Sequence, residues 1–403
     1  MTVIIVGGGA SGLMAALAAA PASDVLLLER QSRVGRKLMA SGNGRCNLSN
    51  LNARPERYHG ADSAFCAAAL ARFGVEDTLA FFSLLGLVSC SEPDGRVYPF
   101  SDTAGSVVDV LRLSAAQAGA DLRTGCEVTE VRRAGGGFVL RSGEEEFRGD
   151  RLIVACGGAA GARLGGGVSG YRLLESLGHK RGPILPALTQ IKTDSRFTRP
   201  LKGVRAKAEL SLRRGGQELG RSGGEVQFTD FGVSGPAAFD LSRAAAAEKG
   251  ELTLHLDLLP ALSRGELLEH LHERKAAFPG LAAEHLLTGA LHNRLALVLL
   301  KQAGLDLASP LSSLGEKQLA AVGELVKDWR LPVLGVLGFD AAQVTAGGVL
   351  TRDFRPDTLE SRIVPGLYAC GEVLDIDGDC GGFNLQWAWS SGYLAGSAAA
   401  GLL

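Results

Sequence analysis

The sequence predicts an α/β fold in which a parallel-sheet core is interrupted by an α+β insertion. Three observations support this prediction. The N-terminus alternates strand, glycine turn and helix, a second glycine turn opens a helix near the C-terminus, and the pattern between them changes at about residues 172 and 342. The chain of 403 residues also exceeds what one hydrophobic core usually serves, which favours two or three packed units.

The N-terminal segment carries a nucleotide-binding pattern. A short β-branched run at residues 3–6 is followed at once by GGGASG and by an alanine- and leucine-rich helix at residues 13–20. In such a unit Gly7 makes the tight turn, Gly9 lets backbone amides approach a pyrophosphate, and Gly12 lets helix and strand pack closely. The helix N-terminus adds free N–H groups and a partial positive charge. The core is therefore expected to be Rossmann-like.

Glu29 extends this pattern. It ends a second apolar strand at residues 25–28, where a carboxylate can accept hydrogen bonds from an adenosine ribose. The alternative is an ordinary glycine turn, since glycine accounts for 55 of the 403 residues. This segment predicts a dinucleotide site, but by itself it does not choose between FAD and NAD.

Two further segments favour FAD. Residues 32–50 are rich in Gly, Ser, Asn and cations and lack apolar periodicity, so we expect a loop whose basic residues reach phosphate; a solvated basic loop is the alternative. Near the C-terminus a short strand at residues 366–369 precedes a glycine turn that opens a helix within residues 380–396. A second helix N-terminus suits a flavin, whose N1 and C2 carbonyl become anionic on reduction. The alternative is a buried C-terminal helix with a glycine start.

Four stretches of the chain together resemble one known family. They are GGGASGLMAA, ERQSRVGRKLMASGNGRCNLSN, FGVSGPAAFDLS and the run from TAGGVL to GYLAG at residues 345–396. The chain is similar in these stretches, in order from residue 3 to about residue 397, to the YhiN/BaiN-like flavoproteins, which are NAD(P)/FAD-dependent oxidoreductases. The resemblance implies a two-dinucleotide-binding-type core that holds FAD non-covalently.

The resemblance also implies which residues meet the cofactor. The implied contacts are Gly7, Gly9, Ser11 and Gly12 with the pyrophosphate, Glu29 with the ribose, Lys37 and the loop 41–47 beside the cofactor, Gly371 and Glu372 with the ribitol and phosphate, and Gly382, Phe383, Asn384 and Leu385 with the pyrimidine edge of the flavin. The remaining predicted cofactor-binding residues are Ala10, Arg30, Arg36, Ser41, Gly42, Arg45, Asn47, Val128, Gly157 and Asp377.

The chain departs from the family at two places that bear on the substrate. It has LGGGVSG at residues 164–170 where relatives carry a Ser-Thr-Gly-Asp-Gly-like run, and Asp230 where the resemblance leads us to expect His. Candidate proton donors are Cys46, Tyr171 and Asp230, with Cys46 and Asp230 retained as the catalytic candidates. Cys46 stands beside Arg45, a neighbour able to lower the pKa of its thiol, but the favoured interpretation of Cys46 is a small apolar filler under the ring. The Cys and His residues show no zinc or triad spacing, so no metal is predicted.

The predicted organisation has four segments. They are the first part of the FAD-binding domain at residues 1–171, an inserted β-rich subdomain at 172–258, an inserted helical subdomain at 259–342, and the second part of the FAD-binding domain at 343–403. Alternating runs at 206–212 and 252–258 favour an antiparallel sheet or barrel, and residues 265–278, 281–304 and 315–329 have helical spacing suited to a cap over a substrate pocket. No second full G-x-G-x-x-G motif appears, so NAD(P)H is expected only as a transient donor.

The charge balance and the cysteine content limit which partners and which cellular compartment the sequence predicts. The 42 basic and 43 acidic residues leave a net charge of -1, which gives no global drive toward nucleic acid. Locally, residues 192–214 hold eight basic residues against two acidic ones, which predicts an RNA or nicotinamide-phosphate docking surface or, alternatively, a solvated strand face. Seven cysteines without C-x-x-C spacing, an N-terminus without a basic leader and the lack of a long apolar run predict a reduced, cytoplasmic chain that binds no membrane.

These features predict an FAD-dependent oxidoreductase. We favour a reductase of an activated C=C bond, either in a small-molecule enone or in a uridine of RNA. The alternatives are an FAD-dependent amine or 2-hydroxy-acid oxidase and a non-catalytic flavin-binding redox sensor. Flavin carries the hydride step in the enzymes, so no Ser/His/Asp triad is required.

Overall fold

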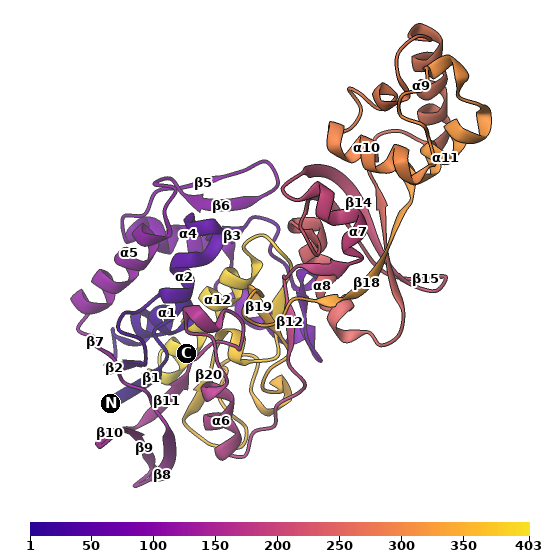
Figure 1. Cartoon of the computed structure of the whole chain (residues 1–403). Coiled ribbons are helices and arrows are strands. Elements are labelled where there is room, and N and C mark those ends of the chain that lie inside the picture. Colours follow the sequence, from indigo (N-terminus) through magenta and orange to yellow (C-terminus); the bar gives the residue numbers. More distant parts are fainter. The chain divides into compact units, whose positions relative to one another are not determined.

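The computed structural model describes all 403 residues and divides them into two compact units (Figure 1). Unit 1 comprises Met1–Leu185 and Ala342–Leu403, and unit 2 comprises Pro186–Ala341. The first predicted boundary, at residue 172, falls inside α6 (Ser169–Ser176). This helix stays with unit 1 because it buries Tyr171 and its neighbouring leucines in the core of that unit.

A five-stranded parallel sheet forms the centre of unit 1. In spatial order its strands are β20 (Leu367–Ala369), β11 (Arg151–Val154), β1 (Thr2–Val6), β2 (Asp24–Glu29) and β7 (Asp121–Thr124). The last four residues of β1 are fully buried, as expected for a parallel strand covered on both faces. The predicted Rossmann-like core is confirmed, and all of its strands end at the same edge.

Two helices pack closely against each other beside this sheet. They are α1 (Ala10–Ala19) and α12 (Phe383–Ala399). Thirteen of the 17 residues of α12 are buried, so this helix lies within the core rather than on its surface. A Cβ on Gly392 would lie 2.4 Å from the Ser11 carbonyl oxygen, and one on Gly396 would lie 2.3 Å from that of Ala15. These two glycines, four residues apart on one face of α12, allow the close packing.

The rest of unit 1 consists of short elements around the sheet. The other helices are α2 (Arg36–Ala40), α3 (Cys66–Arg72), α4 (Val75–Leu84), α5 (Ala104–Gln117) and the single turns η1 (Ser41–Gly44), η4 (Ala162–Leu164) and η9 (Gly371–Val373). The small antiparallel sheets are β3 (Ser49–Asn50), β6 (Arg96–Pro99) and β5 (Ser89–Ser91); β10 (Glu145–Gly149), β9 (Gly137–Ser142) and β8 (Glu130–Ala134); and β21 (Asp377–Gly378) with β4 (Tyr58–His59). β19 (Val344–Ala346) also belongs to this unit, and β12 (Leu185–Ala187) spans the point where the chain leaves it.

The prediction that residues 32–50 form only a loop is wrong in part. Gly35 adopts a left-handed conformation with φ of 70° and starts the short helix α2, which is fixed by the buried side chain of Leu38. The segment then turns through η1 and ends in β3. Its lack of apolar periodicity reflects one buried residue per turn rather than the absence of helix.

Unit 2 is built on a closed antiparallel barrel. Around the barrel the strands are β13 (Ile191–Thr193), β16 (Gly232–Ser234), β15 (Gln217–Phe228), β14 (Arg205–Arg214), β17 (Leu252–Asp257) and β18 (Trp329–Val336). In β17 every second residue is buried, and these are the leucines that fill the barrel interior. The predicted antiparallel barrel is confirmed.

The helices of unit 2 share one hydrophobic core with the barrel. They are α7 (Ser195–Thr198), α8 (Pro236–Ala247), α9 (Arg264–Ala277), α10 (Asn293–Gln302) and α11 (Glu316–Lys327). The structure therefore differs from a strand half followed by a helix half, because α8 lies among the strands and β18 returns after α11 to close the barrel. None of the helices in the chain combines the length and the apolar character that crossing a membrane requires.

Candidate functional site

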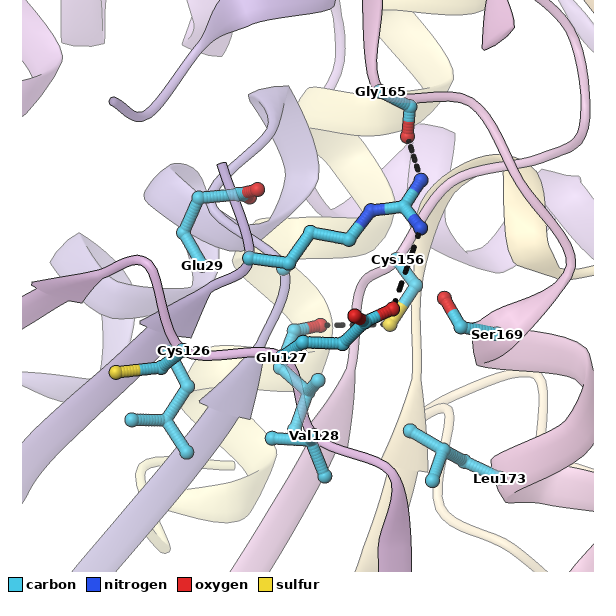
Figure 2. A pocket seen from close by; sticks show the side chains of 12 residues that line it. Glu29, Cys126, Glu127, Val128, Cys156, Gly165, Ser169 and Leu173 are labelled. Carbon is cyan, nitrogen blue, oxygen red and sulfur yellow. Dashed lines mark hydrogen bonds and ion pairs between the residues drawn. The ribbon is translucent and has the colours of Figure 1, made fainter. Parts of the chain in front are cut away.

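A pocket lies at the carboxyl edge of the parallel sheet in unit 1 (Figure 2). It holds about 400 Å³ of space not filled by atoms, part of it open to solvent. Its lining residues are Val6, Gly7, Leu28, Glu29, Arg30, Cys126, Glu127, Val128, Cys156, Gly165, Ser169 and Leu173. Nine of them end or follow β1, β2, β7 and β11, which is where ligands bind in doubly wound sheets, and the other three are Gly165 after η4 and Ser169 and Leu173 of α6.

Two glycines of the first motif, Gly7 and Gly12, are required by close backbone packing, whereas Gly9 faces open space. A Cβ on Gly7, whose φ is 110°, would lie 2.4 Å from the Ala155 carbonyl oxygen, and one on Gly12 would lie 1.9 Å from that of Gly7. Nothing lies within 4 Å of a Cβ on Gly9. Gly9 is the N-cap of α1, which has no side-chain cap and no acid in its first turn. The N–H groups of this helix start thus remain available to an anion, which fits a pyrophosphate.

Glu29 is held in place by backbone N–H groups. One carboxylate oxygen accepts from Gly8 N at 2.7 Å and the other accepts from Gln31 N at 2.7 Å. Each oxygen keeps a further lone pair, and the carboxylate lines the pocket. This arrangement fits a ribose contact.

Lys37 and Glu372 form an ion pair. Lys37 Nζ donates to Glu372 Oε2 at 2.6 Å, and Glu372 Oε1 accepts from Thr345 N at 2.7 Å. The carboxylate therefore ties α2 to β19, and the lysine ammonium is compensated before any phosphate binds. Arg36 is exposed and donates to the side chain of Gln31.

The backbone next to Glu372 is also fixed. Gly371 has a φ of 74°, and its N–H donates to Ser391 Oγ at 2.9 Å. A Cβ at Gly371 would lie 2.5 Å from Ser11 Oγ, so the first turns of the N-terminal motif and the C-terminal motif meet here. Gly157, three residues after the end of β11, has a φ of 69° and open space where a Cβ would lie.

The start of α12 forms the second uncapped helix N-terminus of the site. Gly382 has a φ of 100°, and the helix has neither a side-chain cap nor an acid in its first turn. The Asn47 amide donates to Ser49 O at 3.1 Å and accepts from Gly382 N at 3.2 Å, which connects the loop 41–47 to this helix. Asn384 bonds both the N–H and the carbonyl of Gly378, each at 2.8 Å. The N–H groups of residues 383–385 point along the helix axis, which fits the electron-rich edge of a flavin.

Arg45 does not lower the pKa of the Cys46 thiol. The Arg45 guanidinium pairs with Asp102 and Glu92 and lies over the Tyr98 ring, 4.1 Å from its centroid. Cys46 is 0% exposed, and its burial raises the pKa of the thiol to about 12. Its backbone has a positive φ of 62°. The neutral, enclosed thiol fits the favoured interpretation of a small apolar filler.

The other two proton-donor candidates differ from each other. Asp230 lies in unit 2, where Lys202 Nζ donates to it at 2.7 Å and lowers the pKa of its carboxyl. An ionised carboxylate has no proton to give at neutral pH. Tyr171 is 1% exposed; burial first and the nearby Glu372 carboxylate second raise the pKa of its hydroxyl, while interactions with the Thr345 side chain and the Ala159 backbone act in the opposite direction.

Five of the eight basic residues in the stretch 192–214 form ion pairs, one with Asp194 of the same stretch and four with acids elsewhere in unit 2. Its ion pairs are Arg196–Asp194, Lys202–Asp230, Arg205–Glu225, Arg213–Glu218 and Arg214–Glu248. Lys192, Arg199 and Lys207 form no ion pair. Its count of charges along the sequence therefore overstates the positive potential of this surface.

Most of the predicted cofactor residues lie along the carboxyl edge of the sheet or at the two helix starts. Those that line the pocket itself are Gly7, Glu29, Arg30 and Val128. Ala10 and Ser11 belong to the first turn of α1, Ser41 and Gly42 to η1, and buried Asp377 to β21. The pocket-lining residues outside the predicted set of cofactor contacts are Val6, Leu28, Cys126, Glu127, Cys156, Gly165, Ser169 and Leu173, of which Gly165 and Ser169 belong to the run 164–170 that the sequence placed near the substrate. Of these, Glu127 and Cys156 stand next to predicted residues, and extending each strand-end motif by one position would have found them.

Comparison with known proteins assigns the family. The family described as HI0933-like protein Rossmann domain matches residues 1–398. The chain belongs to this family. The resemblance drawn from the sequence motifs is therefore confirmed.

Two relatives span nearly the whole chain. The 3-dehydro-bile acid delta(4,6)-reductase of Clostridium scindens is 40% identical over 402 residues, which are 98% of both chains. The ribosomal RNA dihydrouridine synthase of Escherichia coli is 32% identical over 97% of this chain and 96% of its own. Among solved structures, the 3-ketosteroid-delta4-(5alpha)-dehydrogenase of Rhodococcus jostii RHA1 in complex with 4-androstene-3,17-dione has a TM-score of 0.50 at 17% identity, covering 99% of this chain and 96% of that one. The last comparison shows the fold alone. The chain is an FAD-binding oxidoreductase.

Proposed function

We propose that this protein is an FAD-dependent reductase of a C=C bond conjugated to a carbonyl in an apolar ring compound, with NAD(P)H as the electron donor. The observation that carries the substrate class is the 40% identity, over 98% of both chains, to an enzyme named for reducing a bile acid. The uncapped starts of α1 and α12 and the fixed carboxylate of Glu29 support the cofactor.

The residues of unit 1 have distinct roles in this proposal. FAD, when bound, supplies the hydride transfer. The start of α1 and Gly9 hold the pyrophosphate, and Glu29 accepts from the ribose hydroxyls. The start of α12, with no carboxylate in its first turn, favours negative charge at the pyrimidine edge. Glu372 is held by Lys37 and by Thr345 N, and it thereby positions the turn η9 in which it lies.

The net reaction is balanced by the donor and one proton. NAD(P)H is oxidised to NAD(P)⁺, a hydride equivalent adds to the β-carbon of the enone, and a proton adds to the α-carbon. Asp230 is ionised and Cys46 is enclosed, so neither is suited to deliver that proton. Tyr171 keeps its proton at neutral pH because its pKa is raised, but it is equally enclosed.

Uridine in ribosomal RNA is the second candidate substrate. It is supported by the 32% identity to the dihydrouridine synthase of Escherichia coli. The ion pairing of five of the eight basic residues in the stretch 192–214 argues against this stretch as a broad RNA-docking surface. We therefore rank the small-molecule enone first.

The test is anaerobic reduction followed by a choice of acceptor. The purified protein is mixed with NADH or NADPH while the flavin absorbance is recorded, and then with a 3-oxo-Δ4 steroid or with uridine-containing ribosomal RNA. The proposal predicts bleaching by a nicotinamide and rapid recovery of the colour with the steroid only. Recovery with RNA alone would establish the second candidate. Bleaching only by an amine or a hydroxy acid would establish an oxidase.

A further inference from the structure

We propose that Arg30 is a positioning residue that latches the glycine loop at residues 161–167 against the FAD pocket and thereby slows release of the cofactor. The loop comes from a part of the chain far from Arg30 in sequence, and it contributes Gly165 to the pocket lining. The inference rests on the proposed function only for the identity of the cofactor.

The guanidinium of Arg30 connects two walls of the pocket. Its Nη2 donates to the carbonyl oxygen of Gly165 at 2.6 Å and to that of Gly166 at 3.2 Å. Its Nη1 lies 3.8 Å from Glu127 Oε1 on the other side. Figure 2 shows these contacts as dashed lines running from the guanidinium to the labelled Gly165 and Glu127. The Arg30 side chain is 29% exposed, so these bonds are partly shielded from water.

The loop is shaped to accept this side chain. Gly165 has a φ of 103°, which favours glycine and turns its carbonyl toward Arg30. A Cβ on Gly166 would lie 2.1 Å from the Ala160 carbonyl oxygen, and one on Gly167 would lie 2.9 Å from Arg30 Nη2. Of these glycines, Gly167 leaves room for the guanidinium, and Gly166 lets the loop pack against the backbone at Ala160.

Apart from Arg30, the loop is tied mainly at its base. Gly167 N donates to Gly158 O at 2.9 Å, and Gly166 N donates to Gly161 O at 3.0 Å. The first bond joins the loop to Gly158, four residues after the end of β11, and the second closes a turn within the loop itself. Arg30 supplies the tie to β2, on the side of the pocket where Glu29 holds the ribose in the proposed complex. Losing that tie would let this wall of the pocket open.

The experiment measures the loop and the cofactor separately. Arg163 in the loop is exposed and forms no ion pair, so trypsin cleavage after it, followed by mass spectrometry, reports on loop opening in the FAD-free protein. FAD release after dilution is followed by the fluorescence of free FAD. The variants are Arg30→Ala, Gly167→Ala, which keeps the arginine but displaces it, and Arg33→Ala as an exposed control of equal charge change.

Arg30→Ala and Gly167→Ala should each speed cleavage after Arg163 and FAD release by about tenfold, the effect of losing one charge-assisted hydrogen bond. Arg33→Ala should change neither. Unchanged cleavage in both loop-directed variants would overturn the latch. Faster FAD release with unchanged cleavage would also overturn it, because Arg30 would then act on the cofactor directly. If the wild-type protein bound no FAD, the proposed function would fail while the cleavage rates would still decide whether the latch exists.

Discussion

Charged side chains are held in different ways in the cofactor-binding core of unit 1 and on the barrel of unit 2. In unit 1, Glu29 and Glu372 accept from backbone N–H groups, and Arg30 donates to backbone carbonyls. On the barrel, charges pair with each other across exposed strands, as in Arg205 with Glu225. Bonds to backbone fix a group relative to the fold, whereas exposed ion pairs contribute little. The comparison teaches that position, rather than the number of charges, separates the site from the surface.

The largest expected effect comes from the tightest backbone contact in the core. Gly12→Ala places a methyl group 1.9 Å from the Gly7 carbonyl oxygen, so β1 and α1 must separate. We expect a loss of about 3 kcal/mol in the free energy of unfolding, measured by urea denaturation of the FAD-free protein. If the variant were as stable as the wild type, the close contact between Gly12 and the Gly7 carbonyl would not be needed to hold β1 and α1 together.

Gly9→Ala sharpens the comparison because it should separate binding from stability. Its Cβ meets no atom within 4 Å, and its φ of −80° suits any residue. The FAD-free protein should lose no more than about 1 kcal/mol of unfolding free energy, since only a helix N-cap changes from glycine to alanine. FAD affinity, measured by fluorescence titration, should fall at least about tenfold because the methyl group stands where the pyrophosphate approaches. If the variant and the wild type bound FAD equally well, the pyrophosphate would not bind at the start of α1.

Glu372→Gln removes a charged group of the site and should have an intermediate effect on the free energy of unfolding. It leaves the Lys37 ammonium without its partner while the bond from Thr345 N can remain. The loss of a half-buried charged hydrogen bond should cost about 2 kcal/mol of unfolding free energy. The matched control is Glu56→Gln, because Glu56 pairs with Arg54 with both side chains at least 70% exposed, and no change is expected there. Equal effects in the two variants would break the distinction between the site and the surface.

Thiol labelling tests the assignment of Cys46 as an enclosed filler. Because burial raises the pKa of its thiol to about 12, only roughly one thiol in ten thousand is ionised at about pH 8. N-ethylmaleimide at that pH should modify exposed Cys90 rapidly and Cys46 only after denaturation, as read by mass spectrometry. Labelling of Cys46 at the rate of Cys90 would restore it as a reactive group.

Features of the fold and the site that depend on neighbouring residues could be predicted from the sequence. Features that depend on residues far apart along the chain could not. The strand, glycine turn and helix at residues 2–19 form from local pattern, and the sequence predicted them. The pairs Lys37–Glu372 and Arg30–Gly165 join residues 335 and 135 positions apart, and no local pattern specifies them. The same holds for β18, whose strand conformation is set by pairing with β13 and β17.

The smallest expected effect belongs to Asp230, on the surface of the barrel unit. The Lys202 ammonium lowers the pKa of its carboxyl, so its contribution to stability is present at neutral pH and is lost only as pH falls through that lowered value. Asp230→Asn should leave the unfolding transition unchanged within error, because both partners are at least 44% exposed. It should also leave the pH dependence of substrate reduction unchanged between about pH 6 and 9, where the carboxylate stays ionised. Lys202→Met is the matched control: it removes the other partner of the same exposed ion pair, and it should likewise leave the unfolding transition unchanged. If Asp230→Asn alone abolished reduction, this exposed carboxylate would be part of the site, and exposure would no longer separate the surface charges from the functional ones.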